Sequence, residues 1–504
     1  MIAKQKKLLV ICTVIFAVIL VLYLAVIRPL VNTEEPAQPG DPLETVEGET
    51  VSVNGRIFMY PQVERAYMQS IKVVNEHGSY EFYRDENDDF QIRGYEGTVF
   101  DGTKFATLVT NVGYTLSKVK VTDNATAAQL AEYGLDNPKA HWTLTTTDGE
   151  TYTVYVGYDL LTGGGYYTML EGRRTVYVLD EALATTVLAP IESLCTPVLV
   201  AGVPQNEYYK IDNFTIMKGD DVFVMISILD KKLQQNPEAA VEHFMRYPSG
   251  YYPNSDLLLE ILYGYGALAG THVEKLGPTA EDMKAYGLDD PAYTVYFEYG
   301  GEKIYLFFSE LQGDGTYYAT SSMFPLTVSV VDEASVSYLQ HDLISWIAVY
   351  PFQQWITAVR KLDIVGSGAD VSFTLNHGVD SSGAATLSVS ADTGKEIPNS
   401  DINNFRQFYK TLLSIAIEDY TPLTDLEKAA LVTEENCILT FTITMTNGTE
   451  TVYRFYPYSG TGRRSLMTVN GHGEFYVLTD LVVKIASDAN KVLYDLDVDS
   501  YGKN

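Results

Sequence analysis

The chain has 504 residues, of which 46% are hydrophobic and 20% are charged, a composition typical of a folded globular protein and not of a disordered one. At roughly 150 residues per domain, this length predicts about three domains. The 65 acidic residues outnumber the 35 basic ones and give a net charge of -30, which repels phosphate backbones and anionic bilayers and argues against nucleic acid as a partner.

The first thirty residues predict a membrane anchor. Residues 1–7 contain three lysines, and the apolar run "LLVICTVIFAVILVLYLAVI" follows and is closed by Arg28. A run of about 20 apolar residues is long enough to cross a bilayer as a helix, whereas a cleaved signal peptide has a shorter apolar region that ends in small residues. We therefore expect an uncleaved, single-pass transmembrane helix at residues 8–28.

The flanking charges predict the orientation of this anchor. The lysines of residues 1–7 indicate a cytoplasmic N-terminus, which would place the bulk of the chain outside the cytoplasm, at the cell membrane. Residues 29–55 are acidic, contain prolines and lack apolar periodicity, as expected of a stalk between membrane and folded part.

A repeated motif divides the rest of the chain. "YGLDNP" begins at Tyr133 and "YGLDDP" at Tyr286, while "PNSD" begins at Pro253 and again at Pro398. Aligning the text around these strings gives three tandem copies of one unit, at residues 64–200, 205–349 and, in a diverged form, 357–497.

Each copy shows the same order of expected elements. An opening hairpin is followed by a helix, a short helix, an antiparallel meander of about four strands and a closing helix. This pattern predicts an α+β fold in which helices pack on β-meanders, preceded by the transmembrane helix. The residues expected on the buried helix faces are Phe105, Leu108, Val109 and Val112 in the first copy and Ile402, Phe405, Tyr409 and Leu412 in the third.

The YGLD motif is interpreted as a structural turn and not as a repeated binding site. A threonine can cap the short helix through a capping box, a glycine can end that helix in a left-handed conformation, and a proline can start the next strand. Asp282 makes the second box an imperfect one, because its side chain is shorter than that of Glu or Gln. The residues are Thr126, Gln129, Gly134 and Pro138 in the first copy and Thr279, Asp282, Gly287 and Pro291 in the second, with Tyr133, Leu135, Tyr286 and Leu288 as apolar anchors.

These motifs resemble a known family. The strings "YGLDNPKA", "TLTTTDGETYTVYVG", "GGGYYTMLEG" and "TVYVLD" are similar to the bacterial domain of unknown function 4340 (DUF4340). The resemblance is best over residues 64–200, weaker over 205–349 and weakest over 357–497. It implies a membrane-anchored protein accessory to an ABC-type export system of the cell envelope, and it supplies no catalytic residue.

The sequence assigns no catalytic, cofactor-binding or metal-binding residue. Asp85, Asn87, Asp89 and Glu96 have the spacing of a calcium loop, but Phe90 stands where a glycine is needed, so an acidic hairpin tip is the simpler interpretation. The seven histidines show no metal-binding spacing. Buried thiols are expected at Cys195 and Cys437, ahead of a disulfide between them.

The 38 tyrosines leave two functions open. We expect a non-enzymatic interaction scaffold with a protein partner in the cell envelope, and the alternative is a protein that binds cell-wall glycan through exposed tyrosines. A hydrolase with an unrecognised site is a third possibility. Adjacent tyrosines should point to opposite sheet faces, and such pairs begin at Tyr166, Tyr208, Tyr251 and Tyr317.

Overall fold

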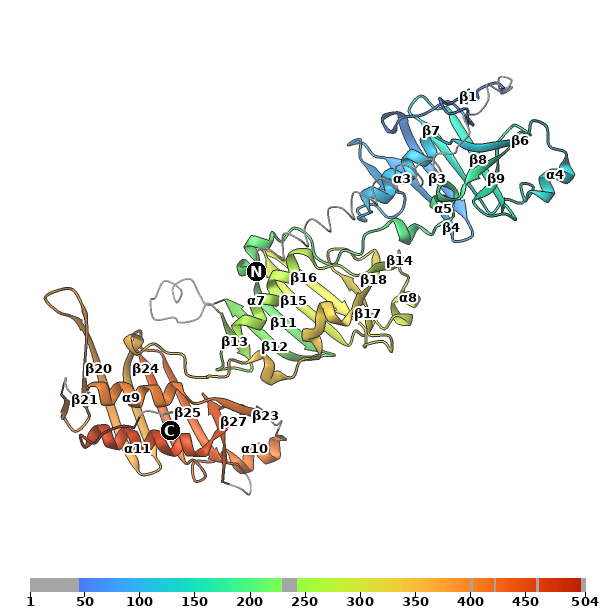
Figure 1. The fold of residues 1–504 in the computed structure, drawn as a ribbon. Coiled ribbons are helices and arrows are strands. Elements are labelled where there is room, and N and C mark those ends of the chain that lie inside the picture. The colour runs from blue at the N-terminus through green and yellow to red at the C-terminus, as the bar shows by residue number, and fades with distance from the viewer. Residues whose placement is uncertain (1–44, 229–242, 399–401, 421–422, 459–461, 500–504) are drawn as a thin grey trace, which may run out of the picture. The chain divides into compact units, whose positions relative to one another are not determined.

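The structure is a computed structural model that describes residues 45–228, 243–398, 402–420, 423–458 and 462–499 (Figure 1). The chain divides into two compact units. The first contains the residues up to Arg93 and Gly102–Pro190, and the second contains Gly94–Asp101 and the residues from Ile191 onward.

The first unit is built on an eight-stranded antiparallel sheet with the strand order β5-β4-β3-β7-β8-β9-β10-β6. A two-stranded sheet of β1 (Thr50–Val51) and β2 (Ile57–Phe58) precedes it. The strands are β3 (Met68–Asn75), β4 (Gly78–Arg84), β5 (Phe90–Ile92), β6 (Ser117–Thr122), β7 (Ala140–Thr146), β8 (Thr151–Asp159), β9 (Gly165–Leu170) and β10 (Val176–Asp180), and the helices are α3 (Gly102–Gly113), α4 (Ala127–Glu132), α5 (Glu181–Leu188) and the 3-10 turn η2 (Arg65–Tyr67).

The second unit holds two further sheets. The eight-stranded one has the order β13-β12-β11-β15-β16-β17-β18-β14. Its strands are β11 (Asp212–Lys218), β12 (Asp221–Ile228), β13 (His243–Tyr247), β14 (His272–Leu276), β15 (Tyr293–Tyr299), β16 (Glu302–Phe308), β17 (Thr316–Ser321) and β18 (Thr327–Asp332), with helices α7 (Ser255–Gly264) and α8 (Ala280–Ala285) and 3-10 segments η3 (Ile191–Leu194), η4 (Gln205–Lys210), η5 (Tyr265–Ala267), η6 (Glu333–Gln340) and η7 (Leu343–Trp346).

The nine-stranded sheet has the order β22-β21-β20-β19-β24-β25-β26-β27-β23. Its strands are β19 (Val359–Gly366), β20 (Ala369–Val379), β21 (Ala385–Ala391), β22 (Glu396–Ile397), β23 (Ile417–Tyr420), β24 (Leu439–Met445), β25 (Glu450–Pro457), β26 (Arg464–Val469) and β27 (His472–Leu478), with the 3-10 turn η8 (Ile356–Ala358) and helices α9 (Ile402–Leu413), α10 (Asp425–Leu431) and α11 (Thr479–Leu493).

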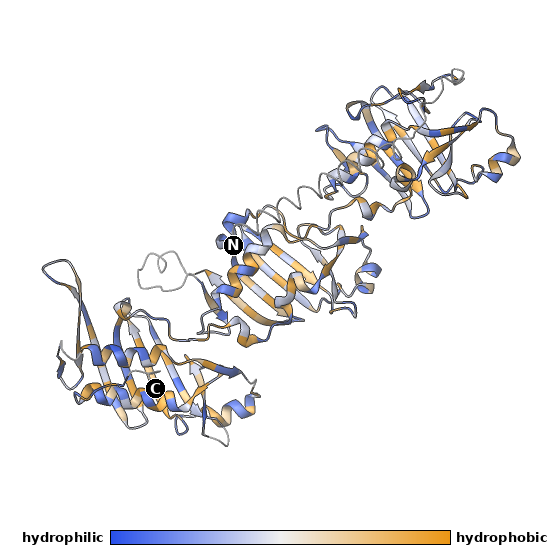
Figure 2. Ribbon diagram, in the orientation of Figure 1, coloured by the Kyte–Doolittle hydropathy of each residue, from blue (hydrophilic) through white to orange (hydrophobic). Residues whose placement is uncertain are grey.

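The three large sheets are built in the same way. The opening hairpin lies beside the first meander strand, the meander continues the sheet, and the strand after the first helix forms the far edge. Strand β7 shows why these segments form strands, because its residues alternate between buried and half-buried along its whole length, the period of two that a one-sided sheet requires. The strand ribbons carry most of the hydrophobic colour in Figure 2.

The expected α+β fold is wrong, because the structure is mostly antiparallel β-sheet with few helices. Each opening hairpin and its meander form one continuous sheet, as β3 pairs with β7, so strands dominate every copy. The expected short helices α4 and α8 have 6 residues each, and the closing helix expected in the second copy is the 3-10 segment η6.

The membrane anchor expected at residues 8–28 lies outside the described residues, as do residues 1–7. Within the described residues, no helix is both long and apolar enough to span a bilayer. Of the expected stalk, residues 29–55, the part from residue 45 onward is described and belongs to the first unit. There the Glu49 carboxylate is buried and lies 2.8 Å from the Lys120 ammonium.

The helix faces were predicted correctly. Helix α3 buries Phe105, Leu108, Val109 and Val112. Helix α9 buries Phe405, Tyr409 and Leu412, and Ile402 is half-buried at its start. Phe105 packs against the buried Phe82 of β4 with 4.8 Å between ring centroids, and Phe405 packs against the buried Phe373 of β20 at 5.4 Å, so both helix faces pack on the apolar side of their sheets.

The structural role of the YGLD motif is confirmed. Both capping boxes are complete, and the second is complete because the Asp282 carboxylate reaches the backbone N–H of Thr279 (2.8 Å). Gly134 and Gly287 have φ of +70° and +67°. The Tyr133 ring stacks on Tyr167 with 4.4 Å between ring centroids, so the turn docks on the sheet.

The two motif glycines form a matched pair for a stability test. A methyl group on Gly134 would lie 2.7 Å from the Tyr158 ring, whereas the nearest atom to one on Gly287 is 3.8 Å away. The left-handed conformation costs an alanine about 1–2 kcal/mol at either position, and overpacking against Tyr158 adds about 1 kcal/mol at the first. We expect Gly134→Ala to lower the free energy of unfolding more than Gly287→Ala in urea denaturation, and equal losses would contradict this.

Candidate interaction site

Each large sheet has a second face, opposite its apolar core. A short helix and its turn pack on one end of this face, as α4 does in the cluster that contains Leu130, Leu135 and Tyr167. Alternate residues of the remaining strands point to the same side, and we call this part of each sheet its open face. Because the three sheets share one strand order, their open faces can be compared position by position.

At two neighbouring positions of its open face, the second sheet has tyrosines where the other two sheets have threonine or valine. Four directly paired residues form a row across four neighbouring strands of each sheet. The rows are Glu81, Lys72, Thr143 and Thr153 in the first sheet, Met225, Thr215, Tyr296 and Tyr305 in the second, and Ser372, Asp363, Thr442 and Val452 in the third.

Three half-buried rings on the second open face form a cluster that we call the aromatic strip: Tyr296, Tyr305 and Phe307. The rings of Tyr296 and Tyr305 have centroids 4.9 Å apart. Those of Tyr305 and Phe307 are 6.3 Å apart and within 6° of parallel. The strip thus offers preformed aromatic contact area, which interfaces use at little entropic cost.

Polar groups hold one side of the aromatic strip in place. The Tyr296 hydroxyl donates to the Glu298 carboxylate, which also accepts from Asn213 Nδ2 at 3.0 Å. Burial raises the pKa of the Tyr296 hydroxyl, and the neighbouring carboxylate raises it further. The ammonium of Lys303 lies 5.9 Å from the Tyr296 ring centroid. The strip therefore has a fixed geometry and a charged border.

Comparison with known proteins finds one family match. Residues 101–243 match the family described as domain of unknown function (DUF4340). This segment, which is less than half of the chain, carries the similarity to DUF4340. The matched DUF4340 segment runs from the start of α3 into the opening hairpin of the second sheet, so the aromatic strip lies beyond it. No curated protein matches the chain, and no solved structure matches it either.

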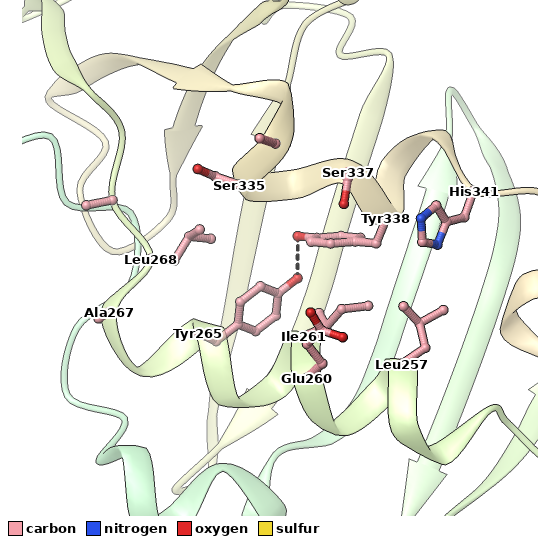
Figure 3. A pocket seen from close by; sticks show the side chains of 13 residues that line it. Leu257, Glu260, Ile261, Tyr265, Ala267, Leu268, Ser335, Ser337, Tyr338 and His341 are labelled. Atoms are coloured by element: carbon pink, nitrogen blue, oxygen red, sulfur yellow. Dashed lines mark hydrogen bonds between the residues drawn. The ribbon is translucent and has the colours of Figure 1, made fainter. Parts of the chain in front are cut away.

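A pocket of 420 Å³ lies between α7 with η5 and the segment η6 (Figure 3). The hydroxyls of Tyr265 and Tyr338 are 2.7 Å apart at its floor, and burial raises the pKa of both. Ser335 and Ser337 also line it, but the described residues give neither serine a hydrogen bond to His341. A nucleophile and base are therefore not joined there, and the aromatic strip is the stronger candidate site.

The acidic loop lies at the hairpin tip between β4 and β5. The Asp85 carboxylate accepts from the backbone N–H groups of Asn87 and Asp89, each at 2.9 Å. The bond from Asp89 is the main cause of the lowered pKa of Asp85. Within the described part of the chain, no cluster of three metal-binding side chains exists. The carboxylate is thus used by the turn, as the simpler interpretation requires.

The two described cysteines are thiols. Cys195 is buried and its thiol donates to the Ile191 carbonyl (3.5 Å), while the half-buried Cys437 donates to that of Leu439 (3.4 Å). The expected buried thiol is confirmed at Cys195, whereas the thiol of Cys437 is only half-buried.

The tyrosine pairs follow the expected alternation in part. In β17, Tyr317 is buried and its neighbour is half-buried, whereas both tyrosines of the pair that begins at Tyr166 in β9 are half-buried. The pair at Tyr208 lies in the 3-10 segment η4, and the pair at Tyr251 lies outside the strands. The residues of the aromatic strip were not singled out from the sequence. The available signal was "YTVYFEYGGEKIYLFF", which puts aromatic residues at alternate positions where the first copy has "HWTLTTTDGETYTVY".

Proposed function

We propose that this chain is an interaction scaffold that binds a protein partner over the aromatic strip. The observation that carries the proposal is the pair Tyr296 and Tyr305, which replaces the threonine pair at the same place in the first sheet. Buried tyrosines dominate the binding energy of many interfaces. Threonine and tyrosine both favour strands, so strand formation alone does not explain why the second sheet has tyrosines where the first has threonines.

The expected place of action remains a prediction. The N-terminal sequence and the family resemblance favour an envelope protein, accessory to an ABC-type transport system, whose bulk lies outside the cytoplasm. The absence of catalysis and of cofactors is likewise a prediction.

The proposal is tested by site-specific photocrosslinking in cells. A photoreactive phenylalanine at position 305 should give a discrete adduct with one protein. The same residue at position 452, which occupies the equivalent place in the third sheet, should give none. No adduct at 305, or equal adducts at both positions, would contradict the proposal.

A double substitution then measures the contribution of the aromatic strip. Tyr296→Thr with Tyr305→Thr restores the residues of the first sheet, and we expect at least about a tenfold loss of partner binding, since each hot-spot aromatic contributes about 2 kcal/mol or more. Tyr83→Thr, which removes a half-buried tyrosine from the first open face, is the matched control and should bind normally. Unchanged binding by the double variant would show that the partner docks elsewhere.

The alternative function, binding of cell-wall glycan, is favoured by one feature of the strip. The rings of Tyr305 and Phe307 are nearly parallel, and Tyr296 of the same strip is hydrogen-bonded to Glu298. Flat rings together with hydrogen-bonding groups suit sugar rings and their hydroxyls. The test is sedimentation with purified wall material. If this chain sediments and its Tyr296→Thr, Tyr305→Thr variant does not, the ligand of the strip is a glycan and not a protein.

A further inference from the structure

The charges at one end of the aromatic strip indicate which kind of side chain the strip receives. A further row of directly paired residues lies next to Tyr296 and Tyr305, two positions along each strand and therefore on the same face. In the second sheet this row is Asp212, Glu298 and Lys303. The equivalent rows are Ser70, Thr145 and Thr151 in the first sheet and Lys361, Thr444 and Glu450 in the third.

Of these three rows, only the one in the second sheet has a net charge. It contains two carboxylates and one ammonium, whereas the row of the first sheet is uncharged and that of the third has one charge of each sign. Like charges on directly opposite residues destabilise a sheet, so the pairing of Asp212 with Glu298 is not explained by strand formation. The whole second copy, residues 205–349, has 21 acidic and 8 basic residues, and its field attracts cations.

The Glu298 carboxylate is fixed beside the rings and is accessible. It accepts from the Tyr296 hydroxyl and from Asn213 Nδ2, and its side chain is 32% exposed. A carboxylate has about four lone-pair sites, so it can accept from a ligand as well. The Lys303 ammonium lies 4.0 Å from this carboxylate and 5.9 Å from the Tyr296 ring centroid. The chain's own cation is therefore already held between a ring and a carboxylate at this end of the strip.

We infer that the aromatic strip receives an arginine from a basic surface of the partner, whose guanidinium lies against the rings of Tyr296 and Tyr305 and donates to Glu298. A guanidinium is planar, so it can stack on a ring while its edge donates to a carboxylate beside that ring. An ammonium has no flat face with which to stack, and an apolar side chain would leave the two paired carboxylates uncompensated. This inference rests on the proposed function, because it specifies the chemistry of the partner at the same site.

The probe in the test is Nα-acetyl-arginine amide, titrated into the full-length protein with 3-fluorotyrosine at position 305 and followed by ¹⁹F NMR. We expect a saturable shift of the fluorine signal. Nα-Acetyl-citrulline amide has nearly the same shape but no charge, and it should bind about tenfold more weakly because its hydrogen bond to the carboxylate comes from a neutral donor. Nα-Acetyl-lysine amide, which cannot stack, should also bind more weakly. Binding of either of these probes as tightly as the arginine probe, or no shift with the arginine probe, would overturn the inference.

Two variants locate the effect of charge at one carboxylate. Glu298→Gln keeps the size of the side chain but removes its charge, so it should bind the arginine and citrulline probes with equal affinity. Glu302→Gln is the matched control, because it removes the same charge from the same hairpin. Glu302 pairs with Tyr299 and precedes Lys303, so its side chain points to the other face of the sheet, and its variant should keep the preference for arginine. A preference that survives in Glu298→Gln overturns the role of this carboxylate.

The crosslinking experiment at position 305 keeps the inference distinguishable from the proposed function. An adduct without a preference for the arginine probe removes the inference alone. A preference for that probe without an adduct removes the protein partner alone, so the two can fail separately.

Discussion

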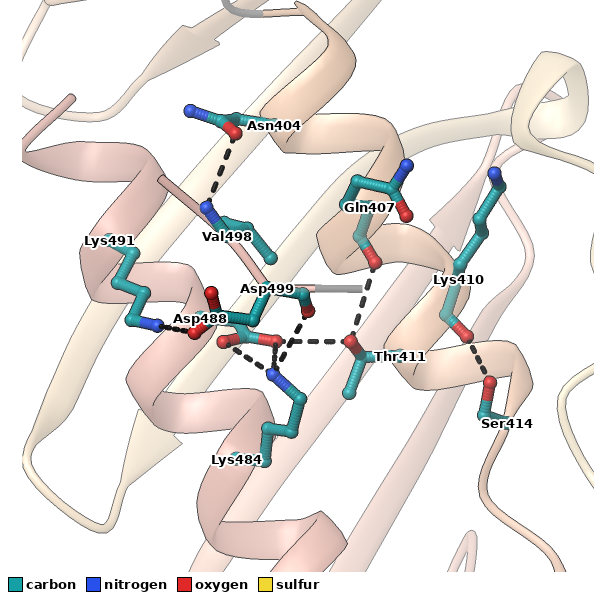
Figure 4. Close-up of polar contacts among 10 residues, drawn as sticks. All are labelled: Asn404, Gln407, Lys410, Thr411, Ser414, Lys484, Asp488, Lys491, Val498 and Asp499. Atoms are coloured by element: carbon teal, nitrogen blue, oxygen red, sulfur yellow. Dashed lines mark hydrogen bonds and ion pairs between the residues drawn. The ribbon is translucent and has the colours of Figure 1, made fainter. Parts of the chain in front are cut away.

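Replacing Asp488 by alanine is expected to lower the free energy of unfolding of the second unit by about 3 kcal/mol, the lower end of the range for breaking a buried ion pair from one side. Asp488 is 1% exposed on α11 and accepts from the Lys484 ammonium at 2.8 and 3.0 Å and from the Thr411 hydroxyl of α9 at 3.0 Å (Figure 4). The substitution leaves the half-buried Lys484 ammonium and the buried Thr411 hydroxyl without their carboxylate acceptor. Urea denaturation of the variant and the parent measures the loss.

A second ion pair of the same helix provides the control. The Lys491 ammonium lies 2.9 Å from the Asp499 carboxylate, whose side chain is 83% exposed. Exposed ion pairs contribute little to stability because water screens them and the side chains lose entropy. Asp499→Ala should therefore have the same free energy of unfolding as the parent. Thr411→Val replaces only the hydroxyl, and its loss of free energy of unfolding should lie between those of the two alanine variants. If Asp488→Ala were as stable as Asp499→Ala, the buried carboxylate would not stabilise the contact between α9 and α11.

Local features of this fold were predictable because they depend on neighbouring residues. The buried face of α3 follows from apolar spacing of three and four residues, and the turn after α4 follows from a cap at Thr126 and a glycine at Gly134. The box at Thr279 was underestimated, since the Asp282 carboxylate reaches the backbone despite its shorter side chain. Such features lie within a few residues of chain.

The sheets and the aromatic strip depend on residues that are distant in the sequence. The pairing of β3 with β7 and the position of β6 at the far edge leave no local signal, so the joining of hairpin, meander and edge strand into sheets of eight or nine strands was not predicted. The aromatic strip becomes visible only when the registers of the three sheets are compared.

The contact between Tyr251 and Gly473 of β27 predicts the other large effect. Gly473 has φ of +134°, and a methyl group there would overlap the Tyr251 hydroxyl and lie 2.9 Å from the carbonyl oxygen of Met467. Tyr251 is 2% exposed and its ring packs against Phe475 with centroids 4.7 Å apart, so it has little room to move. We expect Gly473→Ala to destabilise the second unit by about 3 kcal/mol or more, from backbone strain together with overpacking.

Gly471, in the turn between β26 and β27, is the control that distinguishes the effect of overpacking from that of backbone strain. Its φ is +83°, but a methyl group there would meet nothing within 4 Å, so Gly471→Ala should cost only about 1–2 kcal/mol for the left-handed backbone. Tyr251→Phe removes the overlapping oxygen, and with it a long 3.4 Å hydrogen bond to the Met467 carbonyl. The double variant with Gly473→Ala should therefore lose less free energy of unfolding than the sum of the two single losses. A double-mutant cycle measures this coupling. Additive losses in that cycle would mean that Tyr251 does not restrict position 473.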